Sequence, residues 1–496
     1  MRISPSSDHS SSASFSNNVG NNNNNKIGVL EAIAYCAGDI VGSGIFISPT
    51  SILLHTGSIG MSLCVWVAGA VVASCGALVY VELGTSIRKS GCDFAYLSHA
   101  KWHPIAAAFL WVSTSLTFPA IMAIQTLTFG EYFFDGLRAF WPSLEQNETM
   151  AFVLKRLIGY LAIWLICFIN LFSLQKIAAR FQVILTVLKL LVIALVILTG
   201  LYQIIFRGRT ENFRDTFAGT KTEACEIVLA LFASLFAYNG WDVLNFATEE
   251  IENPRRVLPI GALCGIAISA FVYVLVNIAY FSVMSADEFR HSQAVAALFA
   301  KKTLGHFSRA VPFLVAILLL GNLNSSIFAS SRYLFAGAKN GIMPSALSTV
   351  HANSMSPRVA ILYEVFALIV LSFICDLENL IGYMSYSLWL QKSCTMVALL
   401  YMRLRRGDFP LREDALRTPL VLPVLCLCMF VSLLLISAWA HPLSIAYTMA
   451  MLGVGLMLYY VFIFPQRTLP IVERLNEKSV RFVQIVLNTI ELSKED

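Results

Sequence analysis

The sequence predicts an all-α protein that crosses a membrane many times, and three observations support this class. The 496 residues are 57% hydrophobic, with a mean hydropathy of +0.70. Only 13% are charged, about half of the roughly 25% that is usual in soluble domains. Roughly twelve apolar stretches are long enough to cross a bilayer as helices. The formal charge of +5 does not indicate nucleic-acid binding, because basic residues of such proteins gather in cytosolic loops.

The apolar stretches follow a polar start. Residues 1–26 are rich in serine and asparagine and have no apolar core of a signal peptide, so we expect a disordered cytosolic tail. The segments 104–134 and 309–336 are long and are expected to be tilted. The expected spans are 27–52, 58–86, 104–134, 152–172, 182–205, 225–249, 258–284, 309–336, 358–376, 379–402, 420–440 and 444–465.

The basic residues predict the orientation of these spans. Connections and tails on the side of residues 1–26 hold about twice as many Lys and Arg as the opposite connections, which places both termini in the cytosol. The triplet Asn147-Glu148-Thr149 then lies on the outer side, where Asn147 is a candidate glycosylation site. Residues 405–466 are expected to form a cytosolic loop and the last two spans. Residues 467–496 are a cytosolic tail with apolar residues at helical spacing, which predicts an amphipathic helix.

A glycine-rich break interrupts the first span. Gly42-Ser43-Gly44 lies in the middle of an apolar stretch, although glycine costs about 1 kcal/mol relative to alanine inside a helix. Opened backbone at membrane depth is tolerated only where it lines a cavity. The helix that restarts there directs its positive end and its unpaired N–H groups at the opening. The break therefore predicts a binding site for a carboxylate.

A second break interrupts the sixth span, where Asn239 and Gly240 lie among aromatic residues. The two breaks are five spans apart, so the two halves enter the membrane from opposite sides, as in inverted repeats that meet around a substrate. Glycines that only allow close helix packing are the simpler alternative for either break alone. The pair favours transport, with 27–205 and 206–404 as the two five-helix halves.

Three stretches resemble a known family: Gly38–Phe46, Phe236–Trp241 and Leu244–Pro254. They are similar to the L-type amino acid transporter family, the light chains of heteromeric amino acid transporters in the amino acid–polyamine–organocation superfamily. The resemblance implies a LeuT-type fold of five plus five inverted helices with two additional helices, twelve in all. It implies amino acid exchange across a membrane, which we expect to be the plasma membrane. The sequence contains no P-loop and no zinc-protease motif, so we expect no enzyme activity, cofactor or metal.

The resemblance also implies how an amino acid is held. The carboxylate is expected on the N–H groups of Ser43 and Gly44, and the ammonium on carbonyls of Ile40, Phe236 and Asn239. Phe236 corresponds to the aromatic gate of the family. The substrate-binding candidates are Ile40, Val41, Gly42, Ser43, Gly44, Ile45, Phe236, Ala237, Asn239 and Gly240.

Lys189 is a charged residue in the apolar run Val187–Leu191. An ammonium there must face a polar interior unless it reaches a helix end. In sodium-independent relatives a lysine at this place fills the space of a sodium ion, so we expect transport without sodium.

Two residues depart from the family pattern and are the candidates for specificity. Asp39 replaces the usual threonine, and three roles are open: recognition of a cationic amino acid, binding of a proton, or pairing with Lys189 or a backbone N–H. Asn239 stands where members with neutral substrates usually have glycine and a member with cationic substrates has aspartate, and its amide adds no charge. We expect neutral amino acids, large or aromatic, as substrates.

A third departure concerns the partner. Light chains of the family carry a cysteine between spans 3 and 4 that bridges to a glycoprotein heavy chain, whereas residues 135–151 contain none. No disulfide can form in this connection, so a heavy chain is either non-covalent or absent. Two alternatives to exchange remain: proton-coupled transport that uses Asp39, and an amino acid sensor that binds without transporting.

Overall fold

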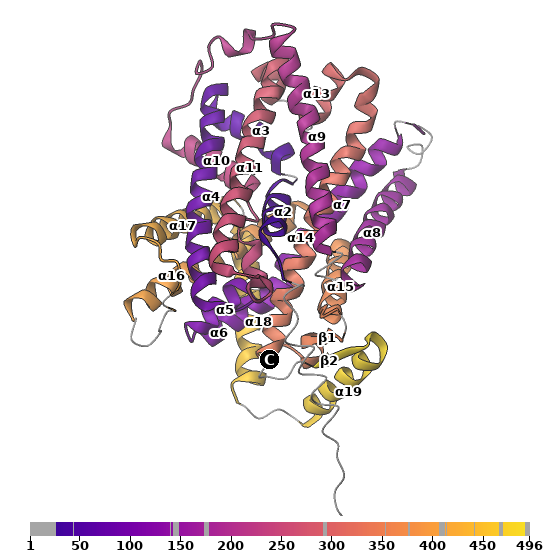
Figure 1. The fold of residues 1–496 in the computed structure, drawn as a ribbon, viewed down its shortest axis with the longest axis vertical. Coiled ribbons are helices and arrows are strands. Elements are labelled where there is room, and N and C mark those ends of the chain that lie inside the picture. The colour runs from indigo at the N-terminus through magenta and orange to yellow at the C-terminus, as the bar shows by residue number, and fades with distance from the viewer. Residues whose placement is uncertain are drawn as a thin grey trace, which may run out of the picture.

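The computed structural model contains many apolar helices arranged mostly along one long axis (Figure 1). It describes residues 26–42, 44–138, 140–141, 148–172, 178–290, 295–352, 354–374, 377–405, 412, 414–440, 442–465 and 470–491. Asn147 and Ser43, both predicted site residues, lie outside these ranges.

Seven helical stretches of the described chain are long and apolar enough to cross a membrane. The third expected span is a single stretch of 36 residues that contains one π-helical segment, η2 (Ser113–Thr117), which accounts for part of its length. The seven stretches are α4 (Ile59–Ile87), α6 (His103–Val112) with η2 and α7 (Phe118–Arg138), α8 (Glu148–Phe172), α9 (Ala179–Ile205), α11 (Pro254–Val283), α14 (Val311–Lys339), and α18 (Pro442–Leu458) with η9 (Tyr459–Ile463).

The first and sixth expected spans are interrupted. The first consists of α2 (Val29–Ile40) and α3 (Gly44–Thr56), which are separated by the glycine-rich break. The sixth begins as α10 (Ala224–Ala237) and continues, after an irregular turn, as the 3₁₀ segment η6 (Val243–Glu250). Neither piece has the length of a full membrane span, so the backbone opens inside the bundle at both places.

The remaining expected spans coincide with α15 (Arg358–Ile374), α16 (Leu377–Leu404) and α17 (Val421–Ala440). Short elements connect the longer helices. They are α5 (Cys92–His99), η5 (Glu211–Phe213), α12 (Ala286–Arg290), α13 (Val295–Thr303), η7 (Gly305–Ala310) and η8 (Ser345–Ser348).

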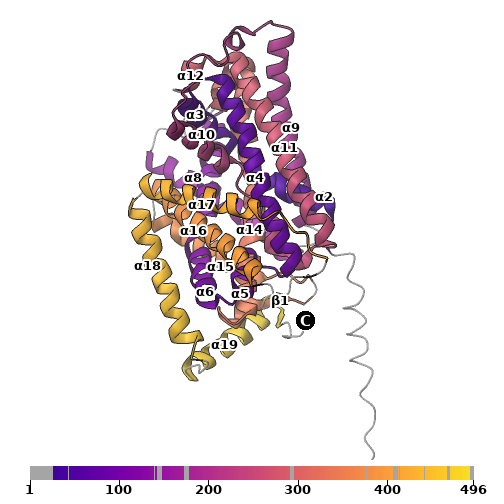
Figure 2. The ribbon, with the colours of Figure 1, turned by 90° about the vertical axis from the view of Figure 1, so that its left-hand side faces the viewer.

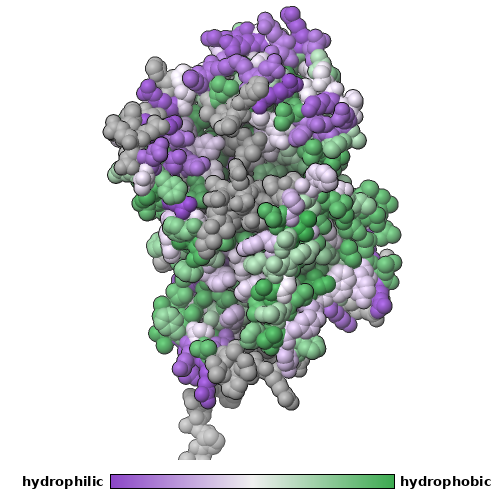
Figure 3. All heavy atoms as spheres, turned by 180° about the vertical axis from the view of Figure 1, so that it is seen from behind, coloured by the Kyte–Doolittle hydropathy of each residue, from purple (hydrophilic) through white to green (hydrophobic). Residues whose placement is uncertain are grey.

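The interrupted helices lie in the centre of the bundle. α2 packs against α11, α9 and α14, and α10 packs against α3 and α4. These helices share one large buried cluster of apolar side chains that includes Tyr35, Trp66 and Tyr273. Large apolar side chains on the outer helices are instead exposed, for example Leu161 (73%), Leu198 (64%) and Phe271 (68%). Figure 3 shows hydrophobic residues over the middle of one face and hydrophilic residues above them. A continuous band of exposed hydrophobic side chains is compatible with contact to lipid rather than to water.

A helix and two short strands lie at the lower end of the molecule in Figure 1. The tail forms α19 (Pro470–Leu487) and the strand β2 (Thr489–Glu491), which pairs antiparallel with β1 (Thr349–His351). Arg358, at the start of α15, donates to the Leu171 carbonyl of α8 and to the Leu487 carbonyl of α19. Figure 2 shows α19 below α18 and beside β1.

Candidate functional site

A cavity of about 180 Å³ lies between the two breaks and the helices α7, α14 and α16. Both interrupted helices contribute to its wall, and so do polar residues of the intact helices. Its lining includes Asp39, Ile40, Gly42, Gly44, Ser113, Thr117, Gln125, Phe236, Ala237, Asn239, Gly240, Asp242, Asn322, Gln391 and Lys392.

Most of the substrate-binding candidates named from the sequence meet at this cavity. Ile40, Gly42, Gly44, Phe236, Ala237, Asn239 and Gly240 line it. Val41 and Ile45 are buried but do not line it, and Ile45 instead lines a smaller apolar hollow beside α9 and α11. Phe236 lines the cavity and is 39% exposed, and its role as a gate stays a prediction.

The two breaks touch each other, and glycine is required for this contact. A Cβ atom on Gly44 would lie 2.6 Å from the Cα atom of Ala237, closer than any side chain can approach backbone. Gly240 has a φ of +107°, a conformation that L-residues with side chains rarely adopt. Helix α3 begins at Gly44, so the unpaired N–H groups of its first turn start at the cavity wall.

Tyr273 of α11 joins the two breaks, and sequence reasoning missed it. Its hydroxyl lies 2.7 Å from the Ile40 carbonyl oxygen and 2.9 Å from the Ala237 carbonyl oxygen. One hydroxyl hydrogen is thus shared between the last residue of α2 and the last residue of α10. A tyrosine in an apolar span is common, so nothing in the sequence distinguished it. A carbonyl oxygen has two lone pairs, so the Ile40 carbonyl can accept a second hydrogen bond.

Lys189 lies in the interior and not at a helix end. Its ammonium donates to the Gly38 carbonyl at 2.5 Å, to the Val41 carbonyl at 2.9 Å, and to the side-chain oxygen of Asn322. Three acceptors match the three hydrogens of an ammonium group. Two of them belong to the C-terminal end of α2, where the helix dipole favours a cation.

Asp39 is half-buried, lines the cavity and approaches the second break. A Cβ atom on Gly240 would lie 2.5 Å from one carboxylate oxygen of Asp39, so the carboxylate spans the gap between the two breaks. Asp39 and Lys189, both among the described residues, do not form an ion pair within 4.0 Å. Asp39 thus lies at the cavity wall, and which of its three expected roles it has stays a prediction.

A second buried lysine also lines the cavity, and the sequence analysis did not single it out. Lys392 of α16 forms an ion pair with Asp242, which follows the second break. Next to them, the Asp93 carboxylate accepts hydrogen bonds from the hydroxyls of Tyr80 and Thr395 and from the Gln391 amide. The sequence did contain a signal for this residue. Lys392 is a charged residue inside the expected span 379–402, just as Lys189 is one inside the expected span 182–205.

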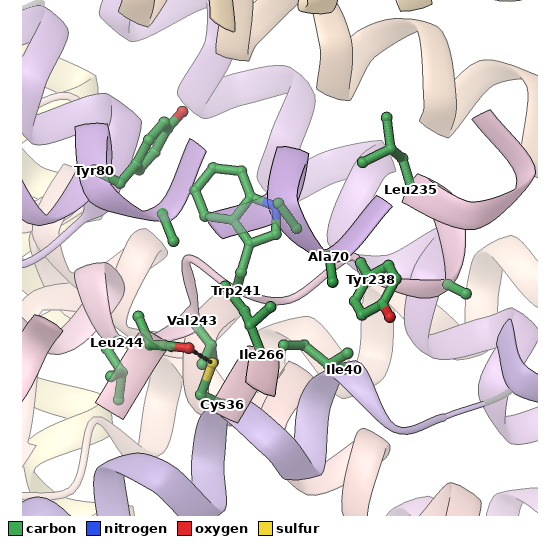
Figure 4. Packing of buried hydrophobic residues seen from close by; sticks show 14 of the residues in the cluster. Cys36, Ile40, Ala70, Tyr80, Leu235, Tyr238, Trp241, Val243, Leu244 and Ile266 are labelled. Atoms are coloured by element: carbon green, nitrogen blue, oxygen red, sulfur yellow. Dashed lines mark hydrogen bonds between the residues drawn. The ribbon is translucent and has the colours of Figure 1, made fainter. Parts of the chain in front are cut away.

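Aromatic side chains pack around the second break. Figure 4 shows Trp241 among the buried side chains of Tyr80, Val243 and Ile266. The ring centroids of Trp241 and Tyr80 lie 4.9 Å apart at nearly a right angle, a favourable aromatic geometry. The irregular turn after α10 is thereby held in one position against α4.

Contacts around Glu250 join the end of η6 to α14 and to the start of the first interrupted helix. The guanidinium of Arg332 on α14 donates to both carboxylate oxygens of Glu250, each at 2.7 Å. Ile27 pairs in parallel with Ile251 through backbone hydrogen bonds of 2.8 and 3.2 Å. The start of the first interrupted helix is therefore tied to the end of the sixth.

The interrupted helices, the shared cavity and the lipid-compatible surface define a polytopic transporter, and comparison with known proteins identifies its family. Residues 27–473 match the family model of the amino acid permeases, so the chain belongs to that family. The resemblance to the light chains of heteromeric amino acid transporters is confirmed by relatives that match over most of the chain. The family and these relatives are transporters and not enzymes.

Three relatives illustrate this likeness. The chain is 42% identical to "Amino acid transporter protein 6" of Caenorhabditis elegans, over 94% of this chain and 89% of the relative. It is 33% identical to the human "Cystine/glutamate transporter", over 94% of this chain and 90% of that one. It is 32% identical to the mouse "Large neutral amino acids transporter small subunit 2", over 89% and 81% of the two chains. The protein is thus a multi-pass membrane protein that transports amino acids.

Proposed function

We propose that this chain is a sodium-independent exchanger of neutral amino acids, with large or aromatic ones preferred. The observation that carries the proposal is the single cavity bounded by both breaks, with Lys189 behind it. In this arrangement the first turn of α3 binds the substrate carboxylate through N–H groups that include that of Gly44, and Ser43, which lies outside the described residues, adds its own N–H group. The ammonium binds near the carbonyls of Ile40 and Asn239, and Phe236 covers the substrate.

Lys189 supports independence from sodium. Its ammonium takes the carbonyl oxygens at the end of α2 and the Asn322 oxygen, which are the hard oxygen ligands that a sodium ion would need. The proposal includes the LeuT-type architecture of twelve spans, with halves at 27–205 and 206–404. It also places the protein in the plasma membrane with both termini in the cytosol.

Uptake by oocytes that express the chain tests the proposal. Uptake of labelled leucine and phenylalanine should be unchanged when choline replaces sodium. Unlabelled leucine outside should accelerate efflux of labelled leucine from inside. Loss of uptake in choline would contradict sodium independence, and saturable binding without accelerated efflux would indicate a sensor instead of an exchanger.

The position of Asp39 at the cavity wall favours a second candidate function, cationic or proton-coupled amino acid transport. A half-buried carboxylate between the breaks suits either a second cation or a proton. Uptake of leucine, phenylalanine and arginine at matched concentrations separates the candidates. Dominant arginine uptake, or a steep dependence of net leucine uptake on pH, would favour the second.

A heavy-chain partner is part of the proposal only in a non-covalent form. The name of the mouse relative describes it as a small subunit, which suggests a larger companion for that protein. Residues 135–151 of this chain offer no cysteine for a bridge. If the chain migrates differently on reducing and on non-reducing gels, it forms a disulfide, which would contradict a non-covalent association.

A further inference from the structure

The ammonium of Lys392 lies in a pocket built for an organic cation. It forms an ion pair with Asp242, and the side chain is only 3% exposed. The nitrogen also lies 4.5 Å from the ring centroid of Trp241 and 4.9 Å from that of Tyr80. Two aromatic faces and a carboxylate around one nitrogen are the means by which proteins recognise ammonium and guanidinium groups.

A second carboxylate adds to this pocket. Asp93 and Asp242 bring oxygen atoms within 4.8 Å of each other and of the Cys92 sulfur. Asp93 is held in place by three donors: the Tyr80 hydroxyl at 2.5 Å, the Thr395 hydroxyl at 2.8 Å and the Gln391 amide at 3.3 Å. The two acidic side chains are thus fixed beside a single basic one, Lys392.

The pocket opens into the substrate cavity. Asp93, Asp242, Gln391 and Lys392 all line that cavity, together with Asn239 and Gly240 of the second break. A substrate whose backbone groups are held at the breaks can therefore extend its side chain toward this pocket. The distal ammonium or guanidinium of a dibasic amino acid has the chemistry that the two carboxylates and the two rings accept.

We propose that Lys392 is a specificity-determining residue, a cation attached to the chain that occupies the subsite for the distal cation of a dibasic amino acid. This inference rests on the proposed transport of neutral amino acids and explains their preference over arginine and lysine. With the ammonium in place, a second cation meets repulsion and finds its aromatic faces covered. Without it, the Asp93 and Asp242 carboxylates line the cavity with no lysine ammonium beside them. The Tyr80 and Trp241 rings then lie against the space that the ammonium filled.

A purely structural ion pair would behave differently. Removing one partner of a buried pair is destabilising because the other charge loses its compensation, and a structural role predicts only loss of transport. A specificity role predicts a gain of arginine uptake relative to leucine uptake, and a loss of stability cannot produce such a gain. The substitution Lys392→Met keeps the length of the side chain and removes its charge.

The test is uptake of labelled arginine and leucine, each normalised to the amount of protein at the cell surface. For Lys392→Met the ratio of arginine to leucine uptake should rise about tenfold or more. Lys392→Arg, which retains the cation, should keep the low ratio. Lys478→Met, which removes an exposed lysine of α19, is the matched control and should leave the ratio unchanged.

The double variant Asp242→Asn with Lys392→Met carries the test if the single variant fails to reach the surface. It removes both charges of the pair and leaves Asp93, so a smaller rise in the ratio is expected. If either variant reaches the surface and takes up leucine but shows no gain of arginine uptake, the inference is overturned. Dominant arginine uptake by the unmodified chain would also overturn it.

Failure of the proposed function is distinguishable from failure of this inference. Binding of leucine and arginine to the purified unmodified protein and to Lys392→Met, measured as thermal stabilisation, does not require transport. If the unmodified chain moves neither amino acid, the proposed function fails. Arginine stabilisation that appears only in Lys392→Met would still support the subsite, and its absence would still contradict it.

Discussion

Lys189 and Lys392 are both buried in the helical bundle and both lie beside an interrupted helix, yet different groups neutralise them. Lys189 meets two backbone carbonyls at the end of α2 and the amide oxygen of Asn322. Lys392 meets the carboxylate of Asp242 and two aromatic rings. The first charge is balanced by dipoles of the opened backbone, and the second by a side chain of opposite charge.

This difference predicts unequal consequences of substitution. A charge that is balanced by backbone cannot be removed together with its partners, because the carbonyls remain. A charge that is balanced by a carboxylate can be removed as a pair, which often costs little. We therefore expect Lys189 to be essential for the break itself and Lys392 to be replaceable with a change of specificity.

The largest effect is expected for Lys189→Met. The Gly38 and Val41 carbonyls and the Asn322 oxygen would lose their donor, and each unsatisfied buried group costs about 1–3 kcal/mol. Leucine exchange should fall by about 100-fold or more. Surface-normalised uptake measures this, with the double variant Asp242→Asn with Lys392→Met as the comparison. Equal losses of leucine uptake in Lys189→Met and in the double variant would remove the distinction drawn between the two lysines.

A smaller loss is expected for Tyr273→Phe, which deletes the hydroxyl that joins the two breaks and keeps the ring. One shared hydrogen bond is worth about 1 kcal/mol, so leucine uptake should fall roughly fivefold. The ratio of arginine to leucine uptake should not change, because the Lys392 pocket is untouched. A change in that ratio would mean that the two regions are coupled.

The substitution Asp39→Thr tests whether the Asp39 carboxylate or the Lys392 pocket determines substrate specificity. Asp39 is half-buried at the cavity wall, where charge interactions are partly screened, so leucine uptake should change less than about threefold. Arginine uptake should remain low because Lys392 is still present. If arginine uptake is high in the unmodified chain and disappears in this variant, Asp39 and not the Lys392 pocket selects the substrate.

The smallest effect is expected for Lys478→Met. Its side chain is exposed on α19, away from both buried lysines, and such substitutions change stability by no more than about 0.5 kcal/mol. Uptake of leucine and the melting temperature of the purified protein should both stay at the level of the unmodified chain. A clear loss would show that removing any cation, buried or not, disturbs this protein.

The two breaks could be located from the sequence because their cause is local. Glycine and small polar residues inside an apolar run contradict the needs of a membrane helix, and that conflict is visible without a structure. Lys189 was found by the same reasoning. The expected spans 104–134 and 309–336 agree within a few residues with the helical stretches His103–Arg138 and Ser308–Lys339.

Partners that meet across the fold could not be predicted in this way. Asp242 and Lys392 are 150 residues apart, and Tyr273 is 233 residues from Ile40. No periodicity or motif encodes such pairs in one sequence. Tyr273 and Asn322 resemble any polar residue of an intact span, and only the contacts of α11 and α14 with α2 identify them.

The pairing of β2 with β1 links the tail to α14, which lines the cavity, and to α15, which packs against α14. β1 lies between α14 and α15, and Arg358 joins that region to the last turn of α19. A molecule that binds the tail would therefore apply force to α15 and, through it, to α14 at the cavity wall. For the same reason a reporter protein fused behind residue 491 needs a flexible spacer, since tension on β2 reaches α15 directly.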